Sequence, residues 1–220
     1  MTERVVIVPY DPHWPKMFEE ESKKIQKALG KNCIEVHHIG STSVPGLSAK
    51  PIIDMIPVVD DISCVDLCDD NMQQLGYEVK GEFGFFLRRF FVKENQFHIH
   101  VFEKGNPEIG RHMKFRDWMR MHPADRIAYE QLKLTLADKF SNDRTAYTFA
   151  KDKFVSNIDN KSGWRGYRIM KAYTDEEWES IKLIREKYHG VYPAYCMQKT
   201  FLTNDDKNTH IIMIKNGINF

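Results

Sequence analysis

The sequence is poor in cysteine, with four in 220 residues, at positions 33, 64, 68 and 196. These cysteines are too few and too scattered to indicate a disulfide framework in a chain of this size. Cys64 and Cys68 stand one helical turn apart, but no second pair follows to complete a zinc site. The cysteines are therefore predicted to be buried free thiols.

The chain also lacks an excess of charge of one sign, since it has 32 Lys and Arg and 31 Asp and Glu, for a formal net charge of +1. A balanced chain creates no strong field that attracts nucleic acid or an anionic membrane. No apolar run approaches membrane-spanning length, and Met1–Arg4 contains no apolar signal region. We therefore expect a cytoplasmic protein with no nucleic-acid or membrane partner.

What the chain does contain is a mixture of strand-like and helix-like segments. Residues 51–59 form an apolar run broken only by Asp54, which is typical of a central strand buried on both faces. After Gly105, helical patterns with apolar stripes dominate. This order predicts an α+β domain in which helices flank a mixed or mostly antiparallel sheet. The expected strands are 5–8, 34–39, 51–59, 77–80, 85–92 and 96–102, and the expected helices are 15–29, 62–75, 107–121, 123–140 and 143–158.

The charge balance changes near residue 160. Residues 1–160 carry 22 basic and 24 acidic side chains, whereas residues 161–220 carry 10 and 7. In the second part, a capping box at Thr174–Glu177 predicts a helix, and residues 195–202 and 209–215 predict a β-hairpin. Such elements bury little surface alone. We therefore expect a main domain, 1–160, and a C-terminal helix-hairpin extension, 161–220, docked on it or on a partner subunit of a homo-oligomer.

The most informative segment is residues 38–54, which read HIGSTSVPGLSAKPIID. Gly40 permits a close approach of the backbone, and Ser41 and Thr42 can offer amides and hydroxyls to the oxygens of a phosphate. Lys50 precedes a proline, so its extended conformation could direct the ammonium toward the same ligand. The alternatives are helix capping for the two hydroxyls and a solvated lysine. Asp54 interrupts an apolar strand, where a carboxylate without a partner is costly, so a role in a site is favoured.

His98 and His100 are two residues apart on an expected strand, so both side chains project from one face. With Asp54 on an adjacent strand they would form a set of two imidazoles and one carboxylate. Such a set can hold a divalent metal, and imidazole suits Zn or Mn better than Mg, although the identity stays open. The alternative is a pair of hydrogen-bonded histidines without a metal.

The same residues resemble the GrpB family, whose members look like divergent proteins of the nucleotidyltransferase fold. Further matches to the family are the residues 8–15, 98–102, 115–117, 122–123 and 143–151. The resemblance covers roughly residues 5–158. It implies a nucleotidyltransferase-like mixed sheet with flanking helices, a Gly-Ser turn, and carboxylates that hold two divalent cations.

The resemblance assigns Gly40 and Ser41 to the turn and Asp54 to the first carboxylate. It also singles out Arg116 in its Phe-Arg-Asp setting as a phosphate contact, against the alternative of a solvated helix face. The second carboxylate position is Ile56, which cannot bind a metal, and the neighbouring strand carries His98 and His100 in place of a third carboxylate. Ordinary two-magnesium nucleotidyl transfer is therefore not expected.

Two functions of different classes remain. The first is a metal-dependent transferase or phosphohydrolase that acts on a nucleotide or related phosphate ester, with Asp54, His98 and His100 as catalytic and metal-binding residues. The second is a non-catalytic protein that binds a nucleotide or phosphometabolite in a degenerate transferase site. A structural subunit, in which the C-terminal hairpin extends a partner's sheet, is a weaker third interpretation.

Overall fold

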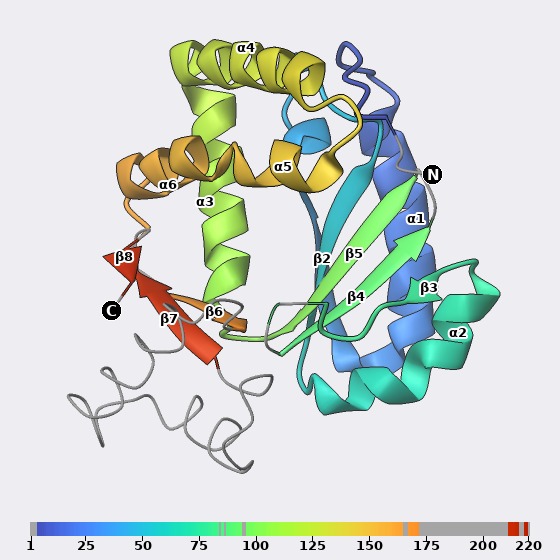
Figure 1. Ribbon diagram of the computed structural model, residues 1–220. Helices are drawn as coiled ribbons and strands as arrows, with labels where there is room; N and C mark the ends of the chain where they lie inside the picture. The colour runs from blue at the N-terminus through green and yellow to red at the C-terminus, as the bar shows by residue number, and fades with distance from the viewer. Residues whose placement is uncertain are drawn as a thin grey trace. The chain divides into compact units, whose positions relative to one another are not determined.

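The computed structural model describes residues 4–83, 85, 87–93 and 96–164, and the backbone of three further strands between residues 167 and 219. The chain forms two compact units, one of residues 1–83 with 87–164 and one of residues 84–86 with 165–220. In the first unit the helices are α1 Trp14–Leu29, α2 Asp69–Gln74, α3 Pro107–Met121, α4 Pro123–Lys139, α5 Arg144–Phe149 and α6 Asp152–Lys161 (Figure 1). Its strands are β1 Cys33–Ile39, β2 Ile53–Val59, β3 Glu78–Val79, β4 Arg88–Lys93 and β5 Phe97–Glu103.

The first unit is built on a five-stranded sheet in the order β1-β2-β5-β4-β3. β2 is antiparallel to β1 and parallel to β5, and β4 is antiparallel to both β5 and β3. The predicted mixed sheet with flanking helices is therefore confirmed. Because the parallel pairing of β2 with β5 sets Asp54 directly beside His98, residues 44 positions apart in the sequence become neighbours.

Helices cover the two faces of this sheet. α1 packs against β1 and β2 on one face, and α3 lies across the other (Figure 1). On the α3 side, Ile109 and Met113 pack against a buried cluster of Ile39, Ile56, Val58 and Phe102. Since alternate strand residues share a face, Asp54 points to the same side as Ile56, and His98 and His100 to the same side as Phe102. The candidate metal ligands therefore lie on the α3 side of the sheet.

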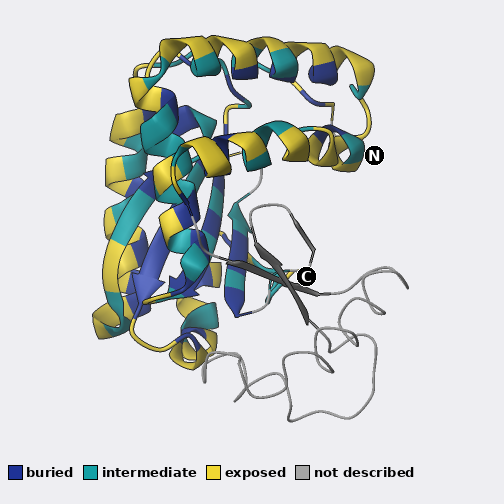
Figure 2. Ribbon diagram, turned by 90° about the vertical axis from the view of Figure 1, so that its left-hand side faces the viewer, coloured by how far each residue is buried: buried dark blue, intermediate teal, exposed yellow. Residues whose placement is uncertain are grey.

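The strands supply most of the buried surface in Figure 2, while the outward sides of the helices are exposed. In β2, Ile53, Met55, Ile56 and Val59 are fully buried, as the apolar run predicted. Ile56, at the position of the absent second carboxylate, is thus a core residue of the sheet.

Three local predictions need correction. Residues 5–8 contribute only an isolated bridge between Val8 and Ala49. The helix expected at 62–75 begins as the 3-10 helix Ser63–Cys68 before α2, and the helix expected at 143–158 is divided into α5 and α6 by a turn at 150–151. The division places Lys151 at the N-cap of α6.

The cysteines are free in the described part of the chain, but they are not buried. Cys33 and Cys68 are half-buried and Cys64 is exposed. Their burial was inferred from residue type alone, whereas two of the three lie in or beside the short 3-10 helix at the surface. Cys196 lies outside the described residues.

The second unit contains an antiparallel sheet, β6-β7-β8, of Tyr167–Lys171, Ile211–Lys215 and Ile218–Asn219. β7 matches the strand expected at 209–215, but its described partners are β6 and β8. The helix expected from Thr174 and the strand expected at 195–202 lie outside the described residues. The boundary near residue 160 and the docking of the extension stay predictions.

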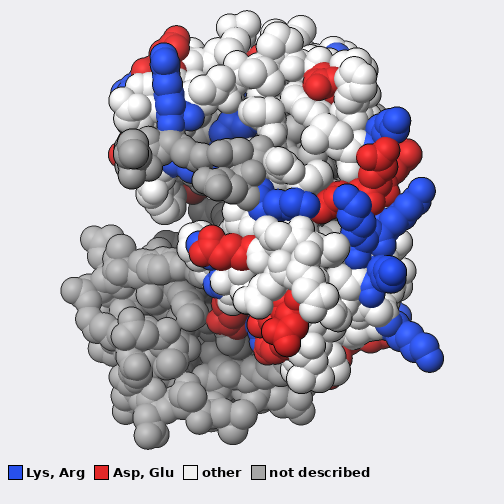
Figure 3. All heavy atoms as spheres, turned by 90° about the vertical axis from the view of Figure 1, so that its right-hand side faces the viewer, with Lys and Arg blue, Asp and Glu red and all other residues white. Residues whose placement is uncertain are grey.

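Acidic and basic side chains are mixed on the face of the molecule that Figure 3 shows. Among the exposed side chains of α1, for example, Lys16 Nζ lies 3.8 Å from Glu20 Oε1. This mixing agrees with the balanced composition. None of the helices among the described residues has the length and apolar character needed to cross a membrane.

Candidate functional site

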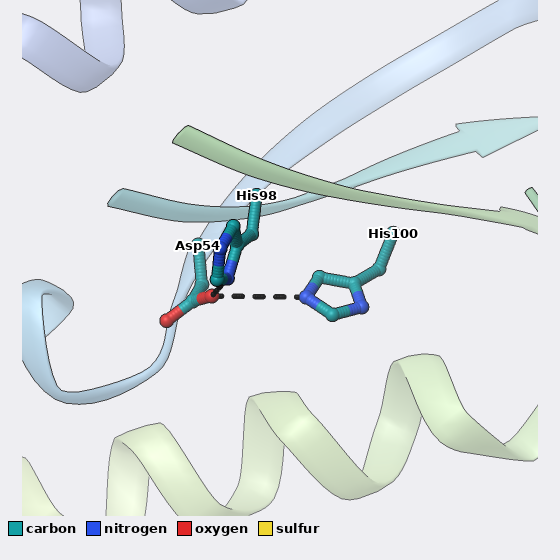
Figure 4. A group of neighbouring side chains, drawn as sticks. All are labelled: Asp54, His98 and His100. Carbon is teal, nitrogen blue, oxygen red and sulfur yellow. Dashed lines mark ion pairs between the residues drawn. The ribbon is translucent and has the colours of Figure 1, made fainter. Parts of the chain in front are cut away.

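Asp54, His98 and His100 converge on the α3 side of the sheet (Figure 4). His98 Nδ1 lies 3.3 Å, and His100 Nε2 lies 3.7 Å, from Asp54 Oδ1. One ligand atom from each residue lies within 4.8 Å of the others, and in the described part of the chain this is the one group of three or more such donors. Their convergence follows from the register of β2 and β5 together with the His-x-His spacing.

Gly40 makes room for the Asp54 carboxylate. Its φ of +70° lies in the region that favours glycine, and a Cβ atom built on Gly40 would lie 2.6 Å from Asp54 Oδ2. The sequence predicted that this glycine lets the backbone approach a ligand. The structure shows that the backbone of the turn also approaches the side chain of Asp54, so Gly40 links the turn to the Asp54 cluster.

The site keeps Asp54 charged and His100 neutral. Burial would raise the pKa of Asp54, but hydrogen bonds from His100 and His98 hold this pKa well below its ordinary range. Burial lowers the pKa of His100 to about 4, against the opposing influence of Asp54. A carboxylate and a neutral imidazole are the protonation states in which these groups bind a metal ion.

Two arginines hold the outer nitrogens of the imidazoles. Arg88 Nη1 lies 3.2 Å from His100 Nδ1, and Arg144 Nη2 lies 3.3 Å from His98 Nε2. A guanidinium only donates, so the outer nitrogens accept and a neutral ring carries its proton on the nitrogen that faces Asp54. Asp54, His98 and His100 have the donor types of a metal site. An ion bound to the ring nitrogens that face Asp54 would leave each ring proton on the outer nitrogen, so Arg88 and Arg144 would have to release the imidazoles.

The turn after Gly40 is held by hydrogen bonds to its main chain. Arg116 Nη1 donates to the carbonyl of His38 at 3.1 Å, and Arg120 donates twice to the carbonyl of Ser43, at 3.0 and 2.7 Å. The hydroxyl of Thr42, a buried residue, donates to the carbonyl of Ile52 at 3.2 Å. Thr42 and Arg116, two of the candidate phosphate contacts, therefore use their side chains within the protein, to shape the turn.

Lysines that the sequence did not single out as a group gather beside this turn. The Nζ atom of Lys133 in α4 lies 3.1 Å from Ser41 Oγ and donates to the carbonyl of Ser48. The Nζ atoms of Lys151 and Lys50 lie 4.3 and 5.4 Å from the centre of the same ring, that of Tyr147. The structure therefore brings three ammonium groups together at one end of the site.

The pKa values of Lys133 and Lys151 are lowered by burial and by neighbouring lysines. Burial and the nearby Lys151 together lower the pKa of Lys133 to about 7. Burial also lowers the pKa of Lys151 to about 8, assisted by Lys50. A buried group of like charges is unfavourable without an anion, so this arrangement suits an anionic ligand. In the structure Lys133 shares its helix face with Tyr129 and Ala137, both buried.

A cavity of about 260 Å³ adjoins the three lysines on the side of Lys50. Arg4, Lys50 and Arg144 line it, together with apolar atoms of the segments around Val5 and Ile52. Arg144 also contacts His98, so the cavity lies next to the histidine and aspartate cluster. Its cationic lining would favour an anionic group.

Comparison with known proteins gives consistent matches. The family model described as "GrpB protein" matches residues 4–161. The chain is 39% identical over 166 residues to "UPF0157 protein YqkA" of Bacillus subtilis (strain 168), covering 74% of this chain and 48% of that protein. It is 39% identical over 156 residues to "UPF0157 protein BH1888" of Halalkalibacterium halodurans, covering 70% of this chain and 80% of that protein.

The conserved protein GrpB from Enterococcus faecalis is a similar solved structure. It has a TM-score of 0.69 and 39% sequence identity, and the match covers 71% of this chain and 96% of that one. The chain thus spans about half the length of the Bacillus subtilis relative but nearly all of the solved structure.

Proposed function

Since this chain belongs to the GrpB family, we propose that it binds a phosphate-bearing small molecule, a nucleotide or a related phosphate ester, and acts on it as a metal-dependent transferase or phosphohydrolase. The observation that supports this function best is the convergence of Asp54, His98 and His100 beside the Gly40-Ser41 turn. A site with these components offers places for both a cation and a phosphate.

The phosphate side of the proposal is supported by the cationic groups. Lys50, Lys151 and Lys133 lie around the turn, and Arg144 joins them at the adjoining cavity. Ser41 is half-buried and is the hydroxyl of the turn that faces the lysines. In this proposal Lys50, Lys151 and Arg144 attract and neutralise the phosphate, while Arg116 and Arg120 keep the turn in shape.

The metal side of the proposal rests on the chemistry of the donor set. Asp54, His98 and His100 would hold the ion, and two imidazoles favour Zn or Mn over Mg. A divalent ion bound there would supply a Lewis acid for a phosphoryl oxygen. Because Ile56 replaces the second carboxylate, the proposal involves one ion and not two.

A second candidate function, a non-catalytic protein that binds a nucleotide or phosphometabolite, is favoured by the two arginines on the histidines. Arg88 and Arg144 direct the ring protons toward Asp54, an arrangement that is complete without an ion. In that case Asp54 is the acceptor for two imidazoles, and the lysines alone bind the phosphate.

Metal analysis combined with thermal unfolding separates the two functions. The purified chain is stripped of metal and then titrated with Zn²⁺ or Mn²⁺, with and without ATP. The first function predicts stoichiometric binding that is lost in His98→Ala and in Asp54→Ala but kept in His37→Ala, a half-buried histidine on β1. Stabilisation by ATP without bound metal, and without turnover, would favour the second function. If neither metal nor ATP shifts the unfolding temperature, both are wrong.

A further inference from the structure

Ser41 has two polar partners that set it apart from an ordinary surface serine. Its Oγ lies 3.1 Å from Lys133 Nζ, and it also hydrogen-bonds the hydroxyl of Tyr129. Ser41 itself is half-buried, whereas Lys133 is only 2% exposed. A serine hydroxyl within hydrogen-bonding distance of a buried amine is the arrangement of a nucleophile and its general base.

The amine of Lys133 is oriented by other groups. It donates to the carbonyl of Ser48 and lies 4.9 Å from the centre of the Tyr129 ring. In the neutral amine, a proton directed at the Ser48 carbonyl leaves the lone pair available to the Ser41 hydroxyl. A base held by a third group in this way completes the arrangement expected around an activated nucleophile.

The surroundings favour the neutral amine near pH 7. Burial and the neighbouring cation Lys151 together lower the pKa of Lys133 to about 7, while the carboxylate of Glu130 opposes the shift. Glu130 accepts a hydrogen bond from the amide of Ser48 at 2.9 Å, so its charge is partly engaged in the loop. Tyr129 remains protonated, because burial raises the pKa of its phenol. A base whose pKa lies near the working pH is efficient in proton transfer.

We propose that Ser41 is a nucleophile, that Lys133 is its general base, and that Ser41 accepts a phosphoryl group from the bound phosphate ester. The Oγ–P bond forms as the bond from phosphorus to the leaving oxygen breaks. The hydroxyl proton passes to Lys133 Nζ and then to the leaving oxygen. The substrate class rests on the proposed function, whereas the reactivity of Ser41 rests on the Ser41–Lys133 contact.

Ser41 occupies a suitable place for this step. It follows Gly40, whose backbone lies against the Asp54 carboxylate, so the hydroxyl sits between the acidic centre and the lysines. The cation Lys151 lies close enough to Lys133 to lower its pKa, and it would attract the phosphate toward the hydroxyl.

The test uses diisopropyl fluorophosphate, an uncharged reagent that phosphorylates activated serines and needs no metal. We expect one adduct per chain in the intact mass, located at Ser41 by peptide mapping and absent from Ser41→Ala. Ser22→Ala, which changes a serine of similar burial on α1, keeps the adduct. Lys133→Met lowers the labelling rate about a hundredfold. Lys133→Arg keeps the positive charge but provides no base at neutral pH, so it does not restore the rate.

The outcomes separate this inference from the proposed function. In the unmodified chain the labelling rate should rise with pH through about 7 and then level off. This measurement does not depend on the folding of any variant. Absence of the adduct, an adduct at another residue, a rate indifferent to Lys133→Met, or rescue by Lys133→Arg would each overturn the inference. Because the reagent is uncharged and needs no metal, the chain stripped of metal should be labelled as fast as the chain loaded with Zn²⁺ or Mn²⁺. Loss of metal binding therefore tests the proposed function alone.

Discussion

Two clusters of buried charge on opposite faces of the same sheet have different characters. On the α1 face, the carboxylate of Glu21 is 2% exposed and bonds Lys24 at 2.7 Å, the Tyr77 hydroxyl at 3.0 Å and Lys93 at 3.2 Å. On the α3 face, Asp54 is shared by two histidines, and Lys50 and Arg144 lie close enough to Lys151 to lower its pKa.

The difference between these clusters indicates which one serves a ligand. Burial opposes the charge on Glu21, but Lys24, Tyr77 and Lys93 keep its pKa below the ordinary value, so that cluster is internally balanced. Beside the Asp54 cluster, Lys151 lowers the pKa of Lys133 and Lys50 lowers the pKa of Lys151, which an incoming anion would relieve. Burial of charge alone therefore does not indicate a ligand site, whereas buried like charges that lower one another's pKa favour one.

The largest effect is expected from Gly40→Ala, which acts on the Asp54 cluster directly. The new Cβ would approach Asp54 Oδ2 to 2.6 Å while the backbone keeps a positive φ, so strain and a steric clash add together. We expect a loss of about 3 kcal/mol in the free energy of unfolding, measured in urea, and loss of metal binding.

Gly46→Ala provides the matched control for this substitution. Gly46 has a similar φ of +76°, but a Cβ there meets nothing within 4 Å, so only the strain of about 1 kcal/mol remains. Adding Asp54→Ala to Gly40→Ala should restore part of the lost stability, because the clashing oxygen is gone. Equal costs for Gly40→Ala and Gly46→Ala would show that the contact with Asp54 is unimportant.

The next effect tests the α1 face. Glu21→Gln removes the charge that Lys24 and Lys93 neutralise and disturbs the hydrogen bond of Tyr77. We expect a loss of about 2 kcal/mol in unfolding free energy, with unchanged binding of Mn²⁺ and ATP. Asp54→Asn should do the opposite, abolishing metal binding at a smaller cost in stability. Reduced ligand affinity in Glu21→Gln would remove the proposed contrast between the two faces.

The sequence predicted the elements that carry Asp54 and the histidines because their patterns are local. An apolar run with one carboxylate indicates a buried strand, and a spacing of two places His98 and His100 on one face. The contact between Gly40 and Asp54 was not predicted, because it joins residues 14 positions apart and becomes visible only in the tertiary structure.

Lys133 and Lys151, unlike Lys50, could not be placed from local patterns. Lys133 contacts Ser41 across 92 residues, and its burial depends on how α4 docks beside the turn. The position of Lys151 depends on the break between α5 and α6, where the sequence predicted a continuous helix. Both effects arise from packing between helices, which residue spacing within one helix does not encode.

The next effect is expected in the pH dependence of stability, where Lys133 alone contributes at most about 1.4 kcal/mol per pH unit. Lys133 has a pKa of about 7 in the folded chain, against about 10.4 when unfolded. Between these values the unfolded chain binds more protons, so this lysine makes stability rise as the pH increases from 7 toward 10. Lys133→Met should flatten that rise and stabilise the chain at pH 7, as measured by urea unfolding at pH 7, 8 and 9. An unchanged slope would mean that the folded-state pKa of Lys133 is not depressed.

The smallest effect concerns Arg116, which the family resemblance offered as a phosphate contact. Its guanidinium donates to the carbonyl of His38 and to Asp117, so any contribution to ligand binding passes through the shape of the turn. We expect Arg116→Lys to weaken ATP binding only about threefold, within the range of a single lost hydrogen bond. Lys151→Met, which removes a cation that the proposed function assigns to phosphate binding, should weaken it at least tenfold. Calorimetric titration of both variants decides the order, and a reversed order would place Arg116 in direct contact with the phosphate.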